Sequence, residues 1–268
     1  MALKYSIARA CRIGARRSNQ DRIGDWTSDE AVLVVVADGM GGHPRGELAA
    51  QLAVDQLIEH FVRDARPRLE RPDTFLLDAF RRAHRTISRE ARELGLADAP
   101  RTVLVAGVLQ DGAVTWLHAG DARFYLLRGG RIAVRSRDDS FVQRLIDLGR
   151  LEEVDAAYHP DRNVVLKCIG GGEPLRLRRP MRVALEKNDI VVFCSDGFWG
   201  PLAPDEIAEG LRGRDLDAEV DALVRCAEAR AGVQCDNVSV VAIAWQERAG
   251  RARARRRTKP ADDLPTEA

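Results

Sequence analysis

Residues 102–127 read TVLVAGVLQDGAVTWLHAGDARFYLL, and this stretch is the most informative one for the fold. It contains strand-like apolar runs at Thr102–Leu109, Val114–Ala119 and Phe124–Leu127, with only a few residues between them. The Asp-Gly pair at 111–112 has the composition of a tight hairpin turn. Short turns of this kind join antiparallel strands, because a parallel crossover needs about a dozen residues or more. The stretch therefore predicts an antiparallel sheet.

Apolar runs of the same character lie on both sides of this stretch. They predict further strands at Leu3–Ala10, Ala31–Ala37, Ile132–Arg135, Arg176–Val183, Asp189–Cys194 and Val238–Trp245. Helical periodicity marks longer segments at Glu47–Arg63, Thr74–Leu94, Phe141–Gly149, Pro204–Leu211 and Leu216–Ala231. The first two helical segments carry broad apolar stripes, so we expect both to pack on one sheet. Together these elements predict a layered α+β domain.

The composition excludes several classes of protein. The 268 residues are 45% hydrophobic and 31% charged, which indicates a folded chain and excludes disorder. No apolar run approaches the roughly 18 residues of a membrane span, and the first residues lack the apolar core of a signal peptide. The five cysteines form no CxxC pair, so we expect neither a disulfide framework nor a zinc–thiolate site. These features together predict a cytoplasmic location.

The end of the chain differs from the rest. Arg248–Ala268 holds seven basic against three acidic residues, so the net charge of +1 hides a mildly acidic body. The same segment has no hydrophobic period. We expect one folded domain over residues 1–246 and a basic, disordered tail over residues 247–268. A solvated tail is the simpler interpretation, and a weak contact with an anionic partner is the alternative.

Several acidic residues stand at the tips of predicted strands. The Asp-Gly pairs at 38–39 and 196–197 each end an intensely apolar run, AVLVVVA or IVVFCS, and lead into a Gly-containing segment. Asp21 and Asp236 also flank predicted strand ends. A single such carboxylate can cap a helix or a turn. If the strand ends converge, however, several carboxylates share one small space.

Clustered carboxylates are costly unless a cation neutralises them. Oxygen ligands without His or Cys select hard ions such as Mg²⁺ or Mn²⁺. The residues alone therefore predict a carboxylate-bound metal site as a hypothesis.

A series of short motifs follows the same order as in a known family. The motifs are Arg16-Arg17-Ser18-Asn19-Gln20-Asp21, Asp38-Gly39-Met40-Gly41-Gly42-His43, Gly120-Asp121-Ala122-Arg123, His159-Pro160 with Arg162-Asn163, Ser195-Asp196-Gly197, and Asp236-Asn237. Any one of them is weak evidence, but the ordered set is specific. Over about residues 3–246 the chain resembles the metal-dependent serine/threonine protein phosphatases of the type 2C (PPM) family, in its compact bacterial form.

This resemblance implies a four-layer αββα sandwich, in which two mainly antiparallel sheets lie between pairs of helices. It also implies a centre of two Mn²⁺ or Mg²⁺ ions at one edge. Asp38 would bridge both ions, and the carbonyl of Gly39 would bind one of them. Asp196 and Asp236 would complete the shell of the other ion.

The remaining site residues follow from the same resemblance. Asp21 would act through a bound water, and Asp121 with Asp196 would offer a third, weaker metal position. Arg16 would grip the substrate phosphate, a role suited to its planar fork of donors. Residues 150–172, here called the flap, would lie beside the active site, with mobility from the Gly run at 170–172.

The implied activity is hydrolysis of phosphoserine and phosphothreonine in proteins, by direct attack of a hydroxide that bridges the two metals. No phosphoenzyme is formed, so we interpret Cys194 and Ser195 as strand-end residues. The expected partners are phosphorylated proteins, including a serine/threonine kinase and its targets, with no specific nucleic acid. A monomer is the default expectation.

Some positions depart from the family pattern. Gln20 stands where a Glu is frequent and removes a charge. Met40 occupies the place of a His that is proposed as general acid in eukaryotic relatives. His43 is a weaker candidate for that general-acid role, and a structural role at the entry to the helix is the alternative. Asp139 replaces a usual His, and we assign it no ligand role. Thr102 is the one Thr kept from a usual pair.

Other functions have less support. A catalytically weak phosphoprotein-binding regulatory module on the same fold is the alternative, and Gln20 is its main support. The loop GMGGHPRGE lacks the GK[ST] ending of a nucleotide-binding P-loop. The Arg-rich tail lacks the interleaved aromatic residues of a nucleic-acid binder.

Overall fold

The computed structural model describes residues 3–40 and 45–246, so the basic tail and His43 lie outside the described residues. The strands are β1 (Lys4–Arg12), β2 (Arg22–Thr27), β3 (Ala31–Gly39), β4 (Arg101–Gln110), β5 (Ala113–Ala119), β6 (Arg123–Arg128), β7 (Arg131–Arg135), β8 (Ile169–Gly170), β9 (Met181–Ala184), β10 (Ile190–Cys194) and β11 (Val238–Gln246). The α-helices are α1 (Gly46–Asp64), α2 (Pro72–Glu93), α3 (Phe141–Asp147), α4 (Asp196–Trp199), α5 (Pro204–Gly210) and α6 (Leu216–Ala231), and the 3₁₀ turns are η1 (Glu153–Tyr158) and η2 (Gly232–Gln234).

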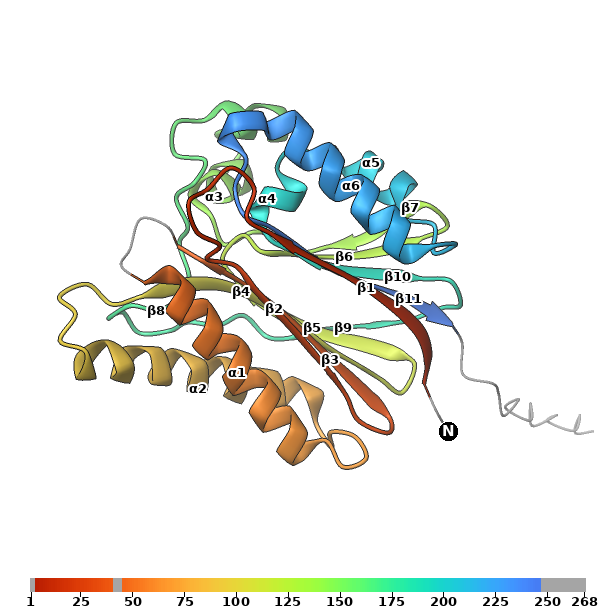
Figure 1. Ribbon diagram of the computed structural model, residues 1–268, viewed down its shortest axis with the longest axis horizontal. Helices are drawn as coiled ribbons and strands as arrows, with labels where there is room; N and C mark the ends of the chain where they lie inside the picture. The colour runs from red at the N-terminus through yellow and green to blue at the C-terminus, as the bar shows by residue number, and fades with distance from the viewer. Residues whose placement is uncertain (1–2, 41–44, 247–268) are drawn as a thin grey trace, which may run out of the picture.

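The strands form two sheets whose neighbouring strands all pair antiparallel. One sheet has the order β1-β11-β10-β6-β7, and the other has the order β2-β3-β4-β5-β9, with β8 paired to β4. Helices α1 and α2 cover the second sheet, while α5 and α6 lie on the far side of the first (Figure 1). The four-layer αββα arrangement is therefore confirmed.

Burial on both faces explains why strand β3 is apolar at every position from Ala31 to Ala37. Leu33 and Val35 face α1 and α2, whereas Val32 and Val34 face the other sheet. A strand that is covered on both faces has no solvent side, so the usual alternation of polar and apolar residues disappears.

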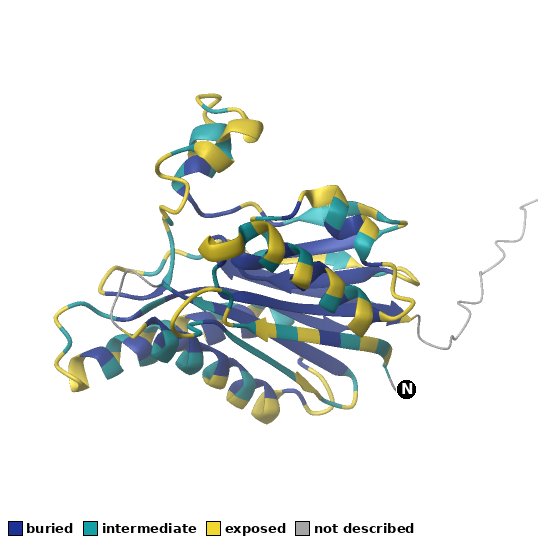
Figure 2. Ribbon diagram, turned by 45° about the horizontal axis from the view of Figure 1, so that its top comes forward, coloured by how far each residue is buried: buried dark blue, intermediate teal, exposed yellow. Residues whose placement is uncertain are grey.

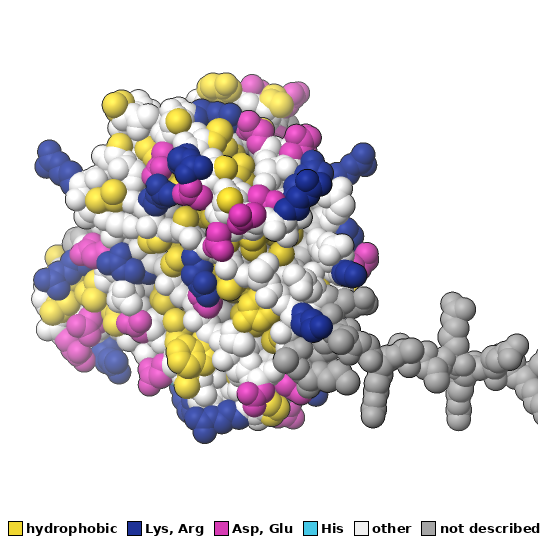
Figure 3. All heavy atoms as spheres, turned by 45° about the vertical axis from the view of Figure 1, so that its right-hand side comes forward, with side chains coloured by type: hydrophobic (Ala, Val, Ile, Leu, Met, Phe, Trp, Pro, Cys, Tyr) yellow, Lys and Arg dark blue, Asp and Glu magenta, His cyan; other side chains and the backbone are white. Residues whose placement is uncertain are grey.

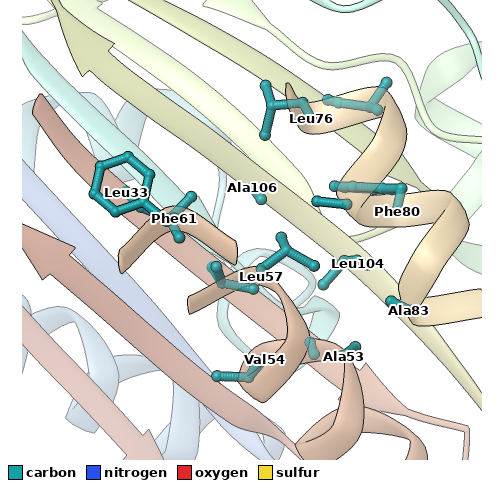
Figure 4. Packing of buried hydrophobic residues seen from close by; sticks show 14 of the residues in the cluster. Leu33, Ala53, Val54, Leu57, Phe61, Leu76, Phe80, Ala83, Leu104 and Ala106 are labelled. Atoms are coloured by element: carbon teal, nitrogen blue, oxygen red, sulfur yellow. The ribbon is translucent and has the colours of Figure 1, made fainter. Parts of the chain in front are cut away.

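The helix layer closes over this strand through large apolar side chains. Leu57 and Phe61 of α1 and Phe80 of α2 lie beside Leu33 and Leu104 of the sheet (Figure 4), and all five are fully buried. Burying each such side chain stabilises the fold by about 1.5–3 kcal/mol. This packing fixes β3, and with it the position of the residues at its end.

The hairpin predicted at residues 111–112 is confirmed. Asp111 and Gly112 have φ angles of 53° and 67°, and Gln110 pairs with Ala113 on either side of them. The predicted strand at 176–183 is wrong over most of its length, because only its end forms β9. Strands β2 and β8 and helix α4 were not predicted.

The segment with α3 and η1 stands clear of the sandwich, and most of its side chains are exposed (Figure 2). Within residues 3–40 and 45–246, no helix is long and apolar enough to cross a membrane.

Candidate metal centre

Five aspartates reach one edge of the sandwich from different segments. Each stands where a strand begins or ends: Asp21 precedes β2, Asp38 is the penultimate residue of β3, Asp121 follows β5, Asp196 follows β10 as the first residue of α4, and Asp236 precedes β11. Asp21 and Asp121 are buried, and the other three keep partial exposure. In the structure, the strand ends that carry these aspartates converge, as predicted.

The proximity of these carboxylates raises their pKa values. For Asp38, burial and then repulsion from Asp21, Asp196, Asp121 and Asp236 raise the pKa well above its ordinary value. Burial is also the largest cause for three others. It raises the pKa of Asp21 to about 7, that of Asp121 to about 8 and that of Asp196 to about 6. Buried carboxylates that disfavour one another's charge are suited to a cation.

Asp21 shows most directly that the donor set fits a hard cation. Its Oδ2 accepts a hydrogen bond from Ser195 Oγ at 2.8 Å, whereas its buried Oδ1 has no hydrogen-bond partner among the described residues. The described His, Cys, Asp and Glu side chains form no group of three or more that is already arranged around a metal position. The carboxylates therefore share an edge without a preformed coordination shell, and their oxygen chemistry suits Mg²⁺ or Mn²⁺.

Arg16 lies beside these carboxylates on the loop between β1 and β2. Its Nη2 donates to Asp236 Oδ2 at 2.6 Å, and 57% of its side chain is exposed. The hydrogen bond to Asp236 is the largest cause that raises the pKa of Arg16, and Asp196 and Asp38 add smaller attractions. A guanidinium thus faces solvent at the rim of the acidic cluster.

Asn237 holds that loop in place. Its Nδ2 donates to the carbonyl oxygens of Ile13 at 2.8 Å and Ser18 at 3.1 Å, and its Oδ1 accepts from Gln20 N at 2.8 Å. The sequence offered no signal for this role beyond the adjacency of Asn237 to Asp236.

Close backbone approaches shape the centre around Gly39. A Cβ atom there would lie 2.5 Å from the carbonyl oxygen of Gly46 and 2.8 Å from that of Gln20. On the other side, Thr102 Oγ1 donates to the carbonyl oxygen of Asp38 at 2.7 Å. Only a glycine lets β3 end this close to the start of α1.

A further network, which sequence reasoning missed, supports Asp121. Trp199 Nε1 donates to the carbonyl oxygen of Asp121 at 3.0 Å, and the guanidinium of Arg123 lies 3.2 Å from the centre of the Trp199 ring. Arg123 is fixed in turn by two hydrogen bonds to Asp138, at 2.9 and 2.8 Å. The turn that carries Asp121 is therefore supported by α4.

The chain matches the sequence profile of protein phosphatase 2C over residues 11–235. It belongs to the protein phosphatase 2C family. A protein of Streptococcus pyogenes described as protein phosphatase 2C-type is 30% identical over 86% of this chain and 94% of its own length. The serine/threonine protein phosphatase PstP of Mycobacterium tuberculosis is 31% identical over 90% of this chain but only 45% of its own length.

Solved structures of protein phosphatase 2C relatives have the same fold. The catalytic domain of PstP in complex with two manganese ions has a TM-score of 0.78 and 26% identity, and the match covers 92% of this chain and all of that domain. The two manganese ions belong to that protein.

Three further positions from the sequence analysis, Asp139, His159 and Met40, make contacts of their own. The carboxylate of Asp139 forms ion pairs with Lys167 and Arg178. His159 lies in the flap, with its ring 6.1 Å from that of Phe141. Met40 donates its backbone N–H to the carbonyl oxygen of Arg101 at 3.0 Å.

Proposed function

We propose that residues 1–246 are the catalytic domain of a metal-dependent phosphatase that hydrolyses phosphoserine and phosphothreonine in proteins. The observation that carries this proposal is the gathering of five aspartates, with raised pKa values for four of them, at one edge of a protein phosphatase 2C fold. The two manganese ions of the related PstP domain support a two-ion centre.

We assign the ligands residue by residue. Asp38 would be a ligand of both ions, which would be Mn²⁺ or Mg²⁺, and the carbonyl of Gly39 would contribute to holding one of them. Asp196 and Asp236 would hold the other, and Asp21 would act through a water. Repulsion from Asp196 is the second cause, after burial, that raises the pKa of Asp121, and this proximity supports a third, weaker position there. When bound, the two principal cations supply a water of lowered pKa and offset the charge of the phosphate.

The chain's own residues position these groups. Ser195 fixes Asp21 by its hydrogen bond, and Asn237 fixes the loop that carries Arg16. Arg16 binds the substrate phosphate through its guanidinium. In the structure this guanidinium is paired with Asp236, and its donors would become available to the phosphate once Asp236 serves as a metal ligand.

The partners follow from the reaction. A phosphoserine or phosphothreonine in a protein is the product of a serine/threonine kinase. We therefore propose such a kinase and its targets as substrates.

Hydrolysis of a phosphothreonine peptide tests this function. We expect phosphate release with Mn²⁺, its loss on addition of a chelator, and a fall of about a thousandfold or more in the Asp38→Asn variant. A folded protein that releases no phosphate with Mn²⁺ or Mg²⁺, but still binds the peptide, would contradict the assignment as a phosphatase. It would favour the phosphoprotein-binding regulatory module.

A further inference from the structure

Asp139 is a buried carboxylate that lies outside the set proposed to bind metal. Its side chain is 2% exposed, and its Oδ1 accepts hydrogen bonds from Lys167 Nζ at 2.8 Å and Arg178 Nε at 3.0 Å. Its Oδ2 has no hydrogen-bond partner among the described residues, and the ring of His118 lies 3.9 Å away. A single buried charge thus holds two cationic side chains.

The backbone of Asp139 connects the proposed metal edge to the flap. Its N–H donates to the carbonyl oxygen of Gly120 at 2.8 Å, directly before Asp121. Its own carbonyl oxygen accepts from the N–H of Leu166 at 2.7 Å, inside the flap. Lys167, the next flap residue, is the one whose ammonium group reaches the Asp139 carboxylate.

The flap has a second attachment on the other side of the metal edge. Ile169 pairs with Thr102 where β8 joins β4, and Thr102 Oγ1 donates to the carbonyl oxygen of Asp38. Lys167 therefore lies between two anchor points, one next to Asp121 and one next to Asp38. Helix α3 and the first part of the flap, which contains η1, project from this edge, and most of their side chains are exposed (Figure 2).

The contacts of Asp139 with Lys167 and Arg178 depend on the negative charge of Asp139. Lys167 is 29% exposed and Arg178 is 46% exposed, so water screens both cations in part, but the carboxylate between them is dry. Hydrogen bonds between ionised partners are the strong ones, and removing the buried anion leaves two neighbouring cations that repel each other. The His that is usual at this position in the family could not supply that negative charge.

We propose that Asp139 is a positioning residue that fixes the flap against the metal centre and thereby sets the affinity for protein substrates. This inference rests on the proposed function. Because the flap is attached beside Asp121 and Asp38, we expect a peptide bound at the metal edge to reach it and a small aryl phosphate to be too short to do so. The contact of Asp139 with the flap should therefore affect the affinity for peptides and not the affinity for the small aryl phosphate.

The test compares Asp139→Asn with the wild-type protein on two substrates. We expect KM for a phosphothreonine peptide to rise about tenfold, while kcat/KM for a small aryl phosphate changes less than twofold. Limited proteolysis within residues 150–166 is expected to become about tenfold faster. Lys167→Gln is expected to show the same changes, and combining the two substitutions should add little, because both act through one contact.

Asp29→Asn is the matched control, since it removes an exposed carboxylate in the turn before β3, at the opposite end of that strand from Asp38, and is expected to change neither readout. The proposal is overturned if Asp139→Asn leaves both the peptide KM and the rate of flap cleavage within twofold of wild type. It is also overturned if both substrates lose activity equally, as a general loss of folding would cause. If the wild-type protein hydrolyses neither substrate, the proposed function fails, and the proteolysis comparison still decides whether Asp139 holds the flap.

Discussion

At the scale of the residue, Gly39 places a strict steric demand on the centre. The Gly39→Ala substitution would put a methyl group within 2.5 Å of the Gly46 carbonyl oxygen, so β3 and α1 must move apart. We expect the free energy of unfolding to fall by about 1–3 kcal/mol, as for overpacked cores, measured by urea denaturation. Gly172→Ala is the control, because a Cβ there meets nothing within 4 Å. Equal losses in the two variants would contradict the close approach.

Single residues also show what the sequence could predict of the site. Asp38 and Asp196 were predictable because each follows an apolar run that must be a buried strand. The partners that hold the site were not. Ser195 bonds Asp21 across 174 positions, and Asn237 bonds Ile13 across 224. Such pairings depend on how the strands stack, which no local pattern reports.

At the scale of the element, the loop between β1 and β2 depends on one side chain from the far end of the chain. Asn237→Ala would leave the Ile13 and Ser18 carbonyl groups and the Gln20 N–H without their present partner. We expect a loss of about 2–3 kcal/mol in the free energy of unfolding. A rise in KM for the phosphopeptide should accompany it, because Arg16 loses its fixed position. Unchanged KM, or an equal effect of the exposed-site control Gln246→Ala, would show that the loop keeps its position without Asn237.

Two segments show where the sequence pattern gave a wrong prediction of secondary structure. Strand β2 (RIGDWT) lies at the edge of its sheet with only partial burial, so it carries little apolar signal. Residues 176–180 alternate like a strand, yet they end at Pro180, which cannot donate to a ladder. Leu175 and Leu177 pack against the helix-covered core without strand pairing, which accounts for the apolar half of that pattern.

At the scale of the whole molecule, connection lengths and helix stripes predicted antiparallel sheets covered by helices, whereas the four-layer order was implied by the resemblance to the family. The cytoplasmic location and the role of the tail stay predictions. The face in Figure 3 carries acidic, basic and apolar side chains interspersed, as is usual for a solvated surface.

The acidic cluster makes overall stability depend on pH. Burial raises the pKa of Asp196 to about 6, of Asp21 to about 7 and of Asp121 to about 8, so ionisation of these groups opposes folding. Below about pH 4 these aspartates are protonated in both the folded and the unfolded protein, so they do not lower the free energy of unfolding. As the pH rises from there, they ionise first in the unfolded protein, so the free energy of unfolding falls until the pH passes the raised pKa values. In chelator, Tm should therefore fall by several degrees between about pH 5 and pH 8, and Mn²⁺ should restore it. A Tm that falls equally with and without Mn²⁺ would contradict this account.

Calorimetric titration of the protein with Mn²⁺ shows whether the five aspartates form one metal centre. We expect two tightly bound ions for each chain, release of protons as the buried aspartates ionise, and loss of tight binding in a folded Asp38→Asn variant. A folded wild-type chain that binds no Mn²⁺, or an Asp38→Asn variant that binds it undiminished, would show that these aspartates do not form a metal centre.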